Sequence, residues 1–478
     1  MVSQIMGKYF KFFLPGIILF AIVVRFVSIN QSLWLDEAIG ALVVKSQNYR
    51  QIITEFPLHD NHPPLYYLTL KLWSDIFGYS EVALRSLSVL MGVATIYVVY
   101  KISELLKIKP YWLSPLLLAT SQIHIYYSQE ARMYIMAAFL ASCAFYFFLK
   151  EKWSLFSLCL TALVFTDYVP IFLLPVFWVI GFINKKPKEW WKNLVLSHLP
   201  LLVLGLLWFP IFLAQSQAGK WLLETLPAWK TVAGGATFKQ ALLVWAKFTF
   251  GRLSLEGKSL YYALVGIFSI PFVLALFRAW KEKSKATALW FYLLTPLFLG
   301  FVASFFFPAF IYFRLLYVLP AFYLLTALGI SRFSKKVQLL LVLTVLTGNL
   351  VGWLIYIKDP YQQREDWRQA VSFVEKKAKE KEMVVFSFTE PFAPYRWYAS
   401  GGVIAKGLTD SISANPEATR KKTLGETLEA KGVYYFEYLW ELHDPERVVE
   451  SSLKDEGFNE VAAFDFPGVG IIRYLRKL

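Results

Sequence analysis

The chain has 478 residues, of which 57% are hydrophobic and 18% aromatic, and its mean hydropathy is +0.47. These values exclude an ordinary soluble domain and indicate a polytopic membrane protein. The formal net charge of +15 does not indicate nucleic-acid binding, because Lys and Arg lie mostly in short segments between apolar runs. Cys143 and Cys159 both lie inside apolar runs, so neither a disulfide framework nor a cysteine-rich zinc site is expected.

Apolar runs that are long enough to cross a bilayer recur along the chain. A span needs roughly 20 apolar residues, and about eleven such runs are present. The first is expected to be retained as a helix, because no small-residue cleavage site follows it. The predicted spans are residues 9–29, 82–102, 111–128, 133–150, 153–167, 169–184, 193–214, 259–279, 287–307, 314–330 and 337–357. The pair between 153 and 184 allows a merged or shifted alternative, and the short apolar segment 63–78 is predicted to be a re-entrant or interfacial helix.

Basic residues occupy every second loop between these spans and predict the orientation of the chain. They cluster near residues 8–11, 101–109, 150–152, 185–192, 278–285 and 331–336. Cytoplasmic loops are enriched in Lys and Arg, so the N-terminus is predicted to be cytoplasmic. An odd number of spans then places the C-terminus outside. We expect a multi-pass protein of the inner (plasma) membrane with long outer segments at 30–62, at 215–258 and after 357.

The segment after residue 357 has the composition of a soluble domain. "REDWRQAVSFVEKKAKEKE" has a helical pattern, and the β-rich runs "MVVFSF", "GVYYFEY", "EVAAFDF" and "GIIRYL" follow it. We therefore predict a transmembrane domain over 1–357 and a small periplasmic or extracellular α/β domain over 358–478.

Polar residues gather on the predicted outer side of the membrane. Asp36 and Glu37 follow the first span, "HDNHPP" closes the first outer loop at 59–64, and "YYSQEARMY" forms an outer turn at 126–134. Polar groups near membrane helices are costly and usually face a cavity. Their convergence on one side favours a functional site.

Each of these residues also has a structural interpretation. Taken alone, Asp36 is equally well explained as a solvated loop residue. Glu130 and Arg132 could form a structural ion pair. Arg85 could be a side chain that extends toward the membrane interface. Taken one at a time, these residues do not establish a site.

Four motifs, "LWLDEA", "NHPPLYYLTLKLW", "EVALRSLSVL" and "YYSQEARMY", resemble in this order the membrane-embedded C-type glycosyltransferases. The chain is most similar to the relatives of dolichyl-phosphate-mannose protein mannosyltransferases and of the aminoarabinose transferases of lipid A. The resemblance covers residues 10–168, and "FIYFRLLYVLPAFYLL" and "REDWRQAVSFV" look like later family segments. It implies the GT-C fold and transfer of a sugar from a polyprenyl-phosphate donor, on the outer face, to a lipid A or other glycolipid, glycan or protein acceptor.

The resemblance also implies which acids carry the reaction. Displacing a lipid phosphate from an anomeric carbon requires a base for the incoming hydroxyl or amine, and cations for the departing phosphate. Asp36 matches the first-loop acid of the family and is the predicted general base. Glu37 is predicted to support it, because an adjacent carboxylate raises the proton affinity of its neighbour. Glu130 matches the second acid of the family.

The residues expected to bind the donor phosphate are His62, Arg132, Arg314 and Arg85. In the aminoarabinose branch a Lys precedes the double proline, where this chain has His62, so the main phosphate contact stays open among His62, Arg132 and Arg314. Lys247 and Arg252 are the next candidates. The residues expected to contact the substrates are Asp60, Tyr134, Asp167 and Tyr168.

A transporter or a lipid-linked sugar flippase is the alternative function, because charges near one membrane face also suit that class. The sequence has no repeated half and no matched pair of broken helices, and a large external domain favours acceptor handling. No cofactor is required by the transferase reaction, and a divalent metal is possible but not indicated. The expected partners are the lipid donor, the acceptor and membrane lipids, and no nucleic acid.

Overall fold

The computed structural model describes residues 2–477, except for the side chains of residues 2–12, 231 and 283–285. The chain forms two compact units. The first comprises Met1–Ile29, Asn48–Gln215 and Ala233–Lys358, and the second comprises Asn30–Gln47, Ser216–Val232 and Asp359–Leu478. The loop that carries Asp36 and Glu37 is therefore counted with the C-terminal region.

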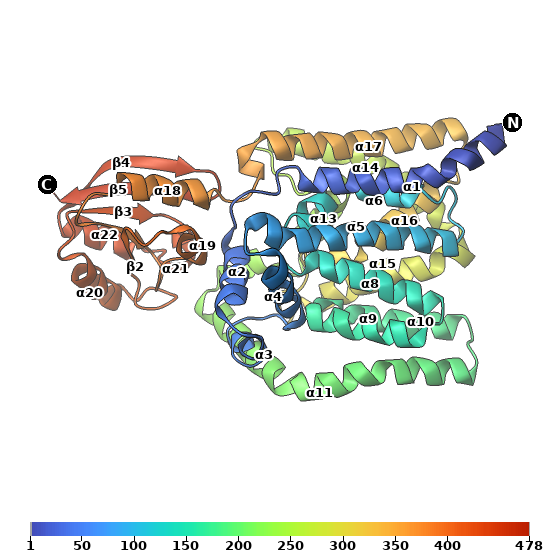
Figure 1. Ribbon diagram of the computed structural model, residues 1–478, viewed down its shortest axis with the longest axis horizontal. Coiled ribbons are helices and arrows are strands. Elements are labelled where there is room, and N and C mark those ends of the chain that lie inside the picture. The colour runs from blue at the N-terminus through green and yellow to red at the C-terminus, as the bar shows by residue number, and fades with distance from the viewer. Residues whose placement is uncertain (1, 478) are drawn as a thin grey trace. The chain divides into compact units, whose positions relative to one another are not determined.

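The first unit is built from apolar helices, and each predicted span corresponds to a helix or to a broken pair (Figure 1). These helices are α1 (Val2–Phe26), α5 (Glu81–Leu105), α6 (Leu113–Thr120), α7 (Gln122–Ser128), α8 (Tyr134–Leu149), α9 (Trp153–Thr166), α10 (Leu174–Ile183), α11 (Lys188–Thr225), α14 (Lys258–Trp280), α15 (Lys283–Ala303), α16 (Leu319–Ile330) and α17 (Lys335–Lys358). Among the described residues, five helices are long and apolar enough to cross a membrane, and shorter apolar helices accompany them. The predicted polytopic helical fold is confirmed.

Short helices fill the segments between the long ones. They are α2 (Leu35–Ser46), α3 (Tyr49–Thr54), α4 (Leu65–Phe77), α12 (Trp229–Ala233) and α13 (Phe238–Phe250), with the 3₁₀ turns η1 (Phe56–Leu58), η2 (Val169–Leu173), η3 (Leu316–Val318) and η4 (Pro360–Gln362). Helix α4 corresponds to the short apolar segment 63–78, which was predicted to be a re-entrant or interfacial helix. Its 13 residues span only about 20 Å, which is too short to cross the hydrocarbon core.

A buried arginine in the first helix accompanies a break in the third predicted span. Helices α6 and α7 are separated at Ser121, which leaves backbone carbonyls without helical partners. The Arg25 guanidinium is fully buried and donates to the Ala119 carbonyl (3.2 Å) and to the Ser128 hydroxyl (3.1 Å). Non-helical backbone at membrane depth requires such internal partners. Sequence analysis missed this contact because it treated residues 9–29 as one apolar run.

The C-terminal region is an α/β domain with a five-stranded mixed sheet. Its strands are β1 (Glu382–Phe386), β2 (Ile404–Gly407), β3 (Gly432–Phe436), β4 (Phe458–Phe466) and β5 (Gly470–Lys477), in the order β2-β1-β3-β5-β4. Strand β1 pairs in parallel with β2 and β3, whereas β5 pairs antiparallel with β3 and β4. The helices are α18 (Trp367–Lys377), α19 (Ala393–Tyr398), α20 (Pro416–Thr427), α21 (Trp440–His443) and α22 (Val448–Asp455).

Helix α18 covers one face of this sheet with an apolar stripe. Trp367, Ala370, Val371 and Val374 recur at helical spacing and are all buried. The Trp367 ring lies parallel to Phe436 of β3 at a centroid distance of 5.8 Å. This packing fixes the start of α18, and hence the preceding residues 364–366, against the sheet.

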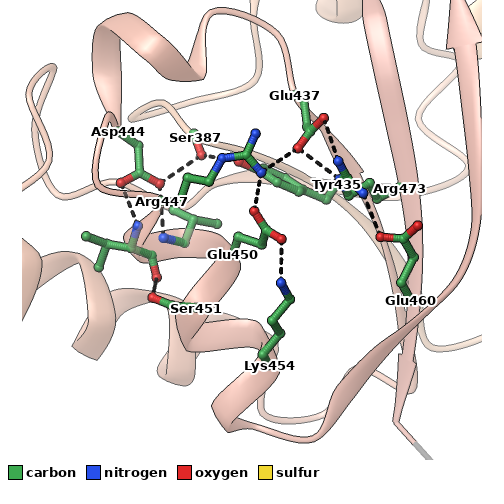
Figure 2. Close-up of polar contacts among 12 residues, drawn as sticks. Ser387, Tyr435, Glu437, Asp444, Arg447, Glu450, Ser451, Lys454, Glu460 and Arg473 are labelled. Atoms are coloured by element: carbon green, nitrogen blue, oxygen red, sulfur yellow. Dashed lines mark hydrogen bonds and ion pairs between the residues drawn. The ribbon is translucent and has the colours of Figure 1, made fainter.

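Polar contacts join α22 to the segment after β3 and to the neighbouring strands, as Figure 2 shows. The buried Asp444 accepts hydrogen bonds from the backbone amides of Val448 (2.8 Å) and Val449 (3.0 Å), which satisfies free N–H groups at the start of α22. Glu437 accepts from Arg447 (3.0 Å) and Arg473 (2.9 Å). The domain is thus tied together on both sides of its sheet.

Candidate active site

Asp36 and Glu37 lie in the first turn of helix α2. Trp34 precedes the helix in an extended conformation and gives no side-chain cap to the free amides. Carboxylates are favoured at this end of a helix, because the exposed backbone N–H groups carry partial positive charge. Glu37 is buried, with 1% of its surface exposed, and Asp36 is partly exposed. Asp36 is therefore the more accessible of the two acids.

The loop before α2 is hydrogen-bonded to the C-terminal domain. The Ser32 hydroxyl donates to the backbone carbonyl of Glu365 (2.6 Å), and the Leu33 amide donates to the Tyr398 hydroxyl (2.7 Å). Further bonds join the pairs Gln31–Arg364 and Asn30–Arg368. The C-terminal domain thus holds the loop that presents Asp36 by hydrogen bonds.

Glu365 brings another carboxyl group to the amino end of α2. It accepts hydrogen bonds from the Tyr438 hydroxyl (3.0 and 3.1 Å), the Trp367 indole (2.7 Å) and the Leu35 backbone amide. Burial, together with the negative charge of Asp36, raises the pKa of Glu365 to about 7 despite these bonds. Sequence analysis missed Glu365, because nothing in its helical segment distinguishes it from a surface acid.

A second cluster, in the first unit, forms around Asp60. One Asp60 oxygen accepts from the His62 backbone amide (2.8 Å) and lies 2.6 Å from the His62 ring nitrogen Nδ1, and the other accepts from the Tyr67 hydroxyl (3.0 Å). Arg132 donates to the same Tyr67 hydroxyl (3.0 Å). Burial opposes ionisation, but His62, Arg132 and Tyr67 outweigh it and lower the pKa of Asp60 to about 2.

Gln215 extends this cluster to the end of the fifth predicted span. Its amide nitrogen donates to the backbone carbonyls of Asp60 (2.9 Å) and His62 (3.0 Å), and its amide oxygen accepts from the Tyr168 hydroxyl (2.5 Å). Trp208 donates to the same hydroxyl (2.7 Å). Asp60, His62, Arg132 and Tyr168 are thus joined in one network, and their roles in substrate binding stay predictions. Gln215 was missed because it lies at the boundary of an apolar run.

Asp167 lies beside this network but bonds locally. Its carboxylate accepts from the Val169 backbone amide (3.1 Å) at the start of η2, and 4% of its surface is exposed. This bond stabilises the turn after α9. A substrate contact by Asp167 stays a prediction.

Glu130 lies in the turn between α7 and α8 and is buried. Its carboxylate interacts electrostatically with Arg252, whose guanidinium lies 4.5 Å from the ring centroid of Tyr126. Tyr134 packs on Phe313 at 5.1 Å. The turn therefore places an acid beside a cation and next to aromatic rings. Arg252, in "FGRLSLEG", was named in advance only as a secondary phosphate candidate.

The two other predicted phosphate ligands bond to backbone carbonyls. Arg85 has 1% of its surface exposed and donates to the Ile29 carbonyl (2.8 Å), and Arg314 donates to the Pro308 carbonyl (2.7 Å). The buried Arg85 therefore does not extend to an interface, and its contact with phosphate stays a prediction. Arg314 is partly exposed, so a second contact with a ligand is sterically open to it.

No group of three or more His, Cys, Asp or Glu side chains converges in the described part of the chain. The clusters around Asp60 and Glu130 instead combine acids with arginine, histidine, tyrosine and glutamine. Such sets favour recognition of phosphate and hydroxyl groups. The metal independence of the reaction stays a prediction.

Residues 61–229 match the dolichyl-phosphate-mannose-protein mannosyltransferase family. No curated protein matches the chain significantly. This matched segment contains His62, Arg85, Glu130, Arg132, Tyr134, Asp167 and Tyr168. The family match therefore covers most of the residues assigned to the site by resemblance.

Solved structures share the fold over nearly the whole chain. ArnT from Cupriavidus metallidurans bound to undecaprenyl phosphate has a TM-score of 0.59 and 12% identity, over 99% of this chain and 98% of that chain. An Archaeoglobus fulgidus oligosaccharyltransferase in complex with Zn and sulfate has a TM-score of 0.55 and 13% identity, over 97% and 73%. Archaeal AglB from the same organism, in complex with an inhibitory peptide and a dolichol-phosphate, has a TM-score of 0.53 and 12% identity, over 97% and 74%. The resemblance is confirmed: the chain has the fold of the membrane-embedded C-type glycosyltransferases, and residues 61–229 match their protein-mannosyltransferase family.

Proposed function

We propose that this protein transfers a sugar from a polyprenyl-phosphate donor to an acceptor on the outer face of the membrane. The observation that carries the proposal is the family match over residues 61–229, which includes the cluster residues His62 and Arg132. Two proteins of the same fold hold undecaprenyl phosphate and dolichol-phosphate, which supports a lipid-linked donor. Nucleotide sugars are cytosolic, so a transferase that faces outward needs sugar delivered on a flipped lipid.

Asp36 is the general base in this proposal. It takes the proton of the acceptor hydroxyl or amine while the acceptor atom bonds to the anomeric carbon. The bond from that carbon to the phosphate oxygen breaks, and its electron pair leaves with the polyprenyl phosphate. Glu37, buried behind Asp36 on α2, supports the base, and Glu130 is the second acid of the site.

Cations stabilise the leaving phosphate as its charge develops. Arg132 is the first candidate, because its guanidinium is held by Tyr67 within the Asp60 cluster and suits a bidentate phosphate contact. Arg314, Arg252, His62 and Arg85 are the further candidates. Asp60, Tyr134, Asp167 and Tyr168 are assigned to sugar and acceptor contacts.

The experiment is donor turnover by the purified protein in liposomes with a synthetic polyprenyl-phosphate sugar. We expect release of polyprenyl phosphate that depends on added acceptor and persists in a chelator. Movement of intact donor across the bilayer without cleavage would instead identify a flippase. Protein-free liposomes provide the control for spontaneous hydrolysis and flipping.

Orientation is tested separately by cysteine labelling. In a variant without Cys143 and Cys159, a cysteine in place of the exposed Ser411 should react with an impermeant maleimide on intact spheroplasts, and one in place of the exposed Lys185 should not. The reverse labelling pattern would place the C-terminal domain inside the cell and remove the argument for a lipid donor.

A further inference from the structure

The amino end of helix α2 meets the C-terminal domain at the side chain of Glu365, and farther along the helix Lys45 lies over the ring of Trp397 in α19. The Leu35 amide at the first position of α2 donates to its carboxylate, and the next residue of that helix is Asp36. The Ser32 hydroxyl bonds to the backbone carbonyl of the same Glu365 (2.6 Å). One residue of the external domain thus contacts both the loop before α2 and the helix start.

The position of Glu365 is built by several elements of the domain. Tyr438, which follows β3, donates to both carboxylate oxygens, and Trp367 donates to one of them (2.7 Å). Gly468 has a φ of +76°, and a Cβ there would lie 2.8 Å from the Glu365 Cα. A glycine is therefore needed for the turn at 467–469 to pass this close. These contacts hold the carboxylate in place in the absence of any ligand.

We propose that Glu365 is a positioning residue for the transfer reaction, which holds the amino end of α2 and, when ionised, places a negative charge beside the Asp36 carboxylate. This inference rests on the proposed function of Asp36 as general base. The carboxylate of Glu365 touches neither reacting group in this scheme. It acts through Asp36, because its charge and that of Asp36 interact electrostatically.

The surroundings of Glu365 make its own ionisation sensitive to pH near neutrality. Asp36 on α2 and Tyr438 after β3 act on its ionisation, Glu37 is a further acid in the first turn of α2, and Arg364 and Asp366 flank it in the chain. The turn at 467–469 carries no ionisable side chain. Burial and Asp36 raise its pKa to about 7, well above the ordinary glutamate value. Turnover should therefore rise with pH through this range, as Glu365 ionises beside Asp36.

The test is the pH dependence of kcat for the full-length protein in liposomes with a saturating polyprenyl-phosphate sugar. The variant E365Q keeps the shape of the side chain but removes the charge. We expect the inflection near pH 7 to disappear and kcat above pH 8 to fall by about 10-fold. The KM for the donor should stay within about 2-fold, because the substituted group does not bind donor. The control E460Q removes the same charge from an exposed position on β4.

A second variant, Y438F, should shift the inflection of the pH profile instead of removing it. Y438F removes the hydroxyl that stabilises ionised Glu365, so the inflection should move up by about one pH unit while the alkaline plateau is kept. A purely structural role predicts lower kcat at every pH with no movement of the inflection. If E365Q does not fold, Y438F still decides between the two.

An activity-independent readout separates this inference from the proposed function. In wild-type protein, the infrared band of a protonated carboxyl should titrate near pH 7, be absent in E365Q, and titrate at lower pH in D36N. Loss of this pattern, or an E365Q pH profile parallel to that of wild type, overturns the inference. If wild type cleaves no donor but the infrared pattern holds, the proposed function fails while the coupling of Glu365 to Asp36 stands.

Discussion

Two partly buried carboxyl groups, Asp60 in the helical unit and Glu365 in the C-terminal domain, have opposite environments. Asp60 is bonded to His62 and Tyr67 and lies in the field of Arg132, which lowers its pKa to about 2. Glu365 is bonded to neutral donors and faces Asp36, and burial raises its pKa to about 7. The difference comes from the neighbours, because both groups are largely removed from water.

The comparison separates a permanently charged group from a titratable one. Asp60 stays ionised at any physiological pH and organises the residues assigned to phosphate and sugar binding. Glu365 changes charge close to neutral pH, where an acid–base reaction operates. The predictions below alter one of the two environments at a time.

Removing the cation from the Asp60 cluster should have the largest effect. Arg132→Ala should lower turnover by about 100- to 1,000-fold and donor affinity less, because the contact strengthens as charge develops on the leaving phosphate. Single-turnover kinetics and separate donor-binding measurements distinguish the two quantities. Arg420→Ala, at an exposed ion pair with Asp455, is the control. Normal consumption of donor by Arg132→Ala would move the phosphate site to Arg314, Arg252 or Lys247.

Neutralising Asp60 should destabilise the protein. Its folded pKa of about 2 lies below the ordinary value of 3.8, so its contribution is present above pH 4 and is lost as pH falls toward 2. Asp60→Asn should therefore lower the free energy of unfolding by about 2 kcal/mol at pH 7. Denaturation in detergent at several pH values measures this. The exposed Asp75, which accepts from Tyr49 and Lys71, is the control, and equal losses in Asp75→Asn would contradict the assignment.

Neutralising Glu365 should instead stabilise the protein at alkaline pH. Its folded pKa of about 7 lies above the ordinary value of 4.5, so ionisation reduces stability as pH rises through this interval. Glu365→Gln should unfold at the same temperature as wild type at pH 4 and at a higher temperature at pH 8, where its free energy of unfolding should be about 3 kcal/mol larger. Thermal scans at both pH values provide the measurement. A variant less stable than wild type at pH 8 would show that the charged form is favoured by its surroundings.

Hydropathy predicted the helical spans well, because a membrane segment needs a long apolar run wherever it packs. Hydropathy did not predict the contacts of polar residues inside these apolar runs. Arg25, for example, is buried in α1 and donates to the Ala119 carbonyl near the end of α6. In the C-terminal domain, β2 was missed, because its four residues carry too little pattern to distinguish a strand from a loop.

The site was predicted in part. The motif resemblance selected Asp60, His62 and Arg132, and the structure joins them through Tyr67 and hydrogen bonds. Glu365 could not be found from the sequence, because its special environment arises only when the C-terminal domain packs its start against the loop at 30–35. A domain boundary predicted from composition alone separates these two segments.

The most direct test of the transferase mechanism is the rate of polyprenyl phosphate release by Asp36→Asn under saturating donor and acceptor. The amide keeps the shape of the side chain but removes the base, so donor binding should be unchanged while release falls by about 100- to 10,000-fold. Glu37→Gln should have a milder effect, and Asp465→Asn, in the C-terminal domain, should have none. Release by Asp36→Asn at the wild-type rate would contradict the assignment of Asp36 as the general base and, with it, the proposed role of Glu365.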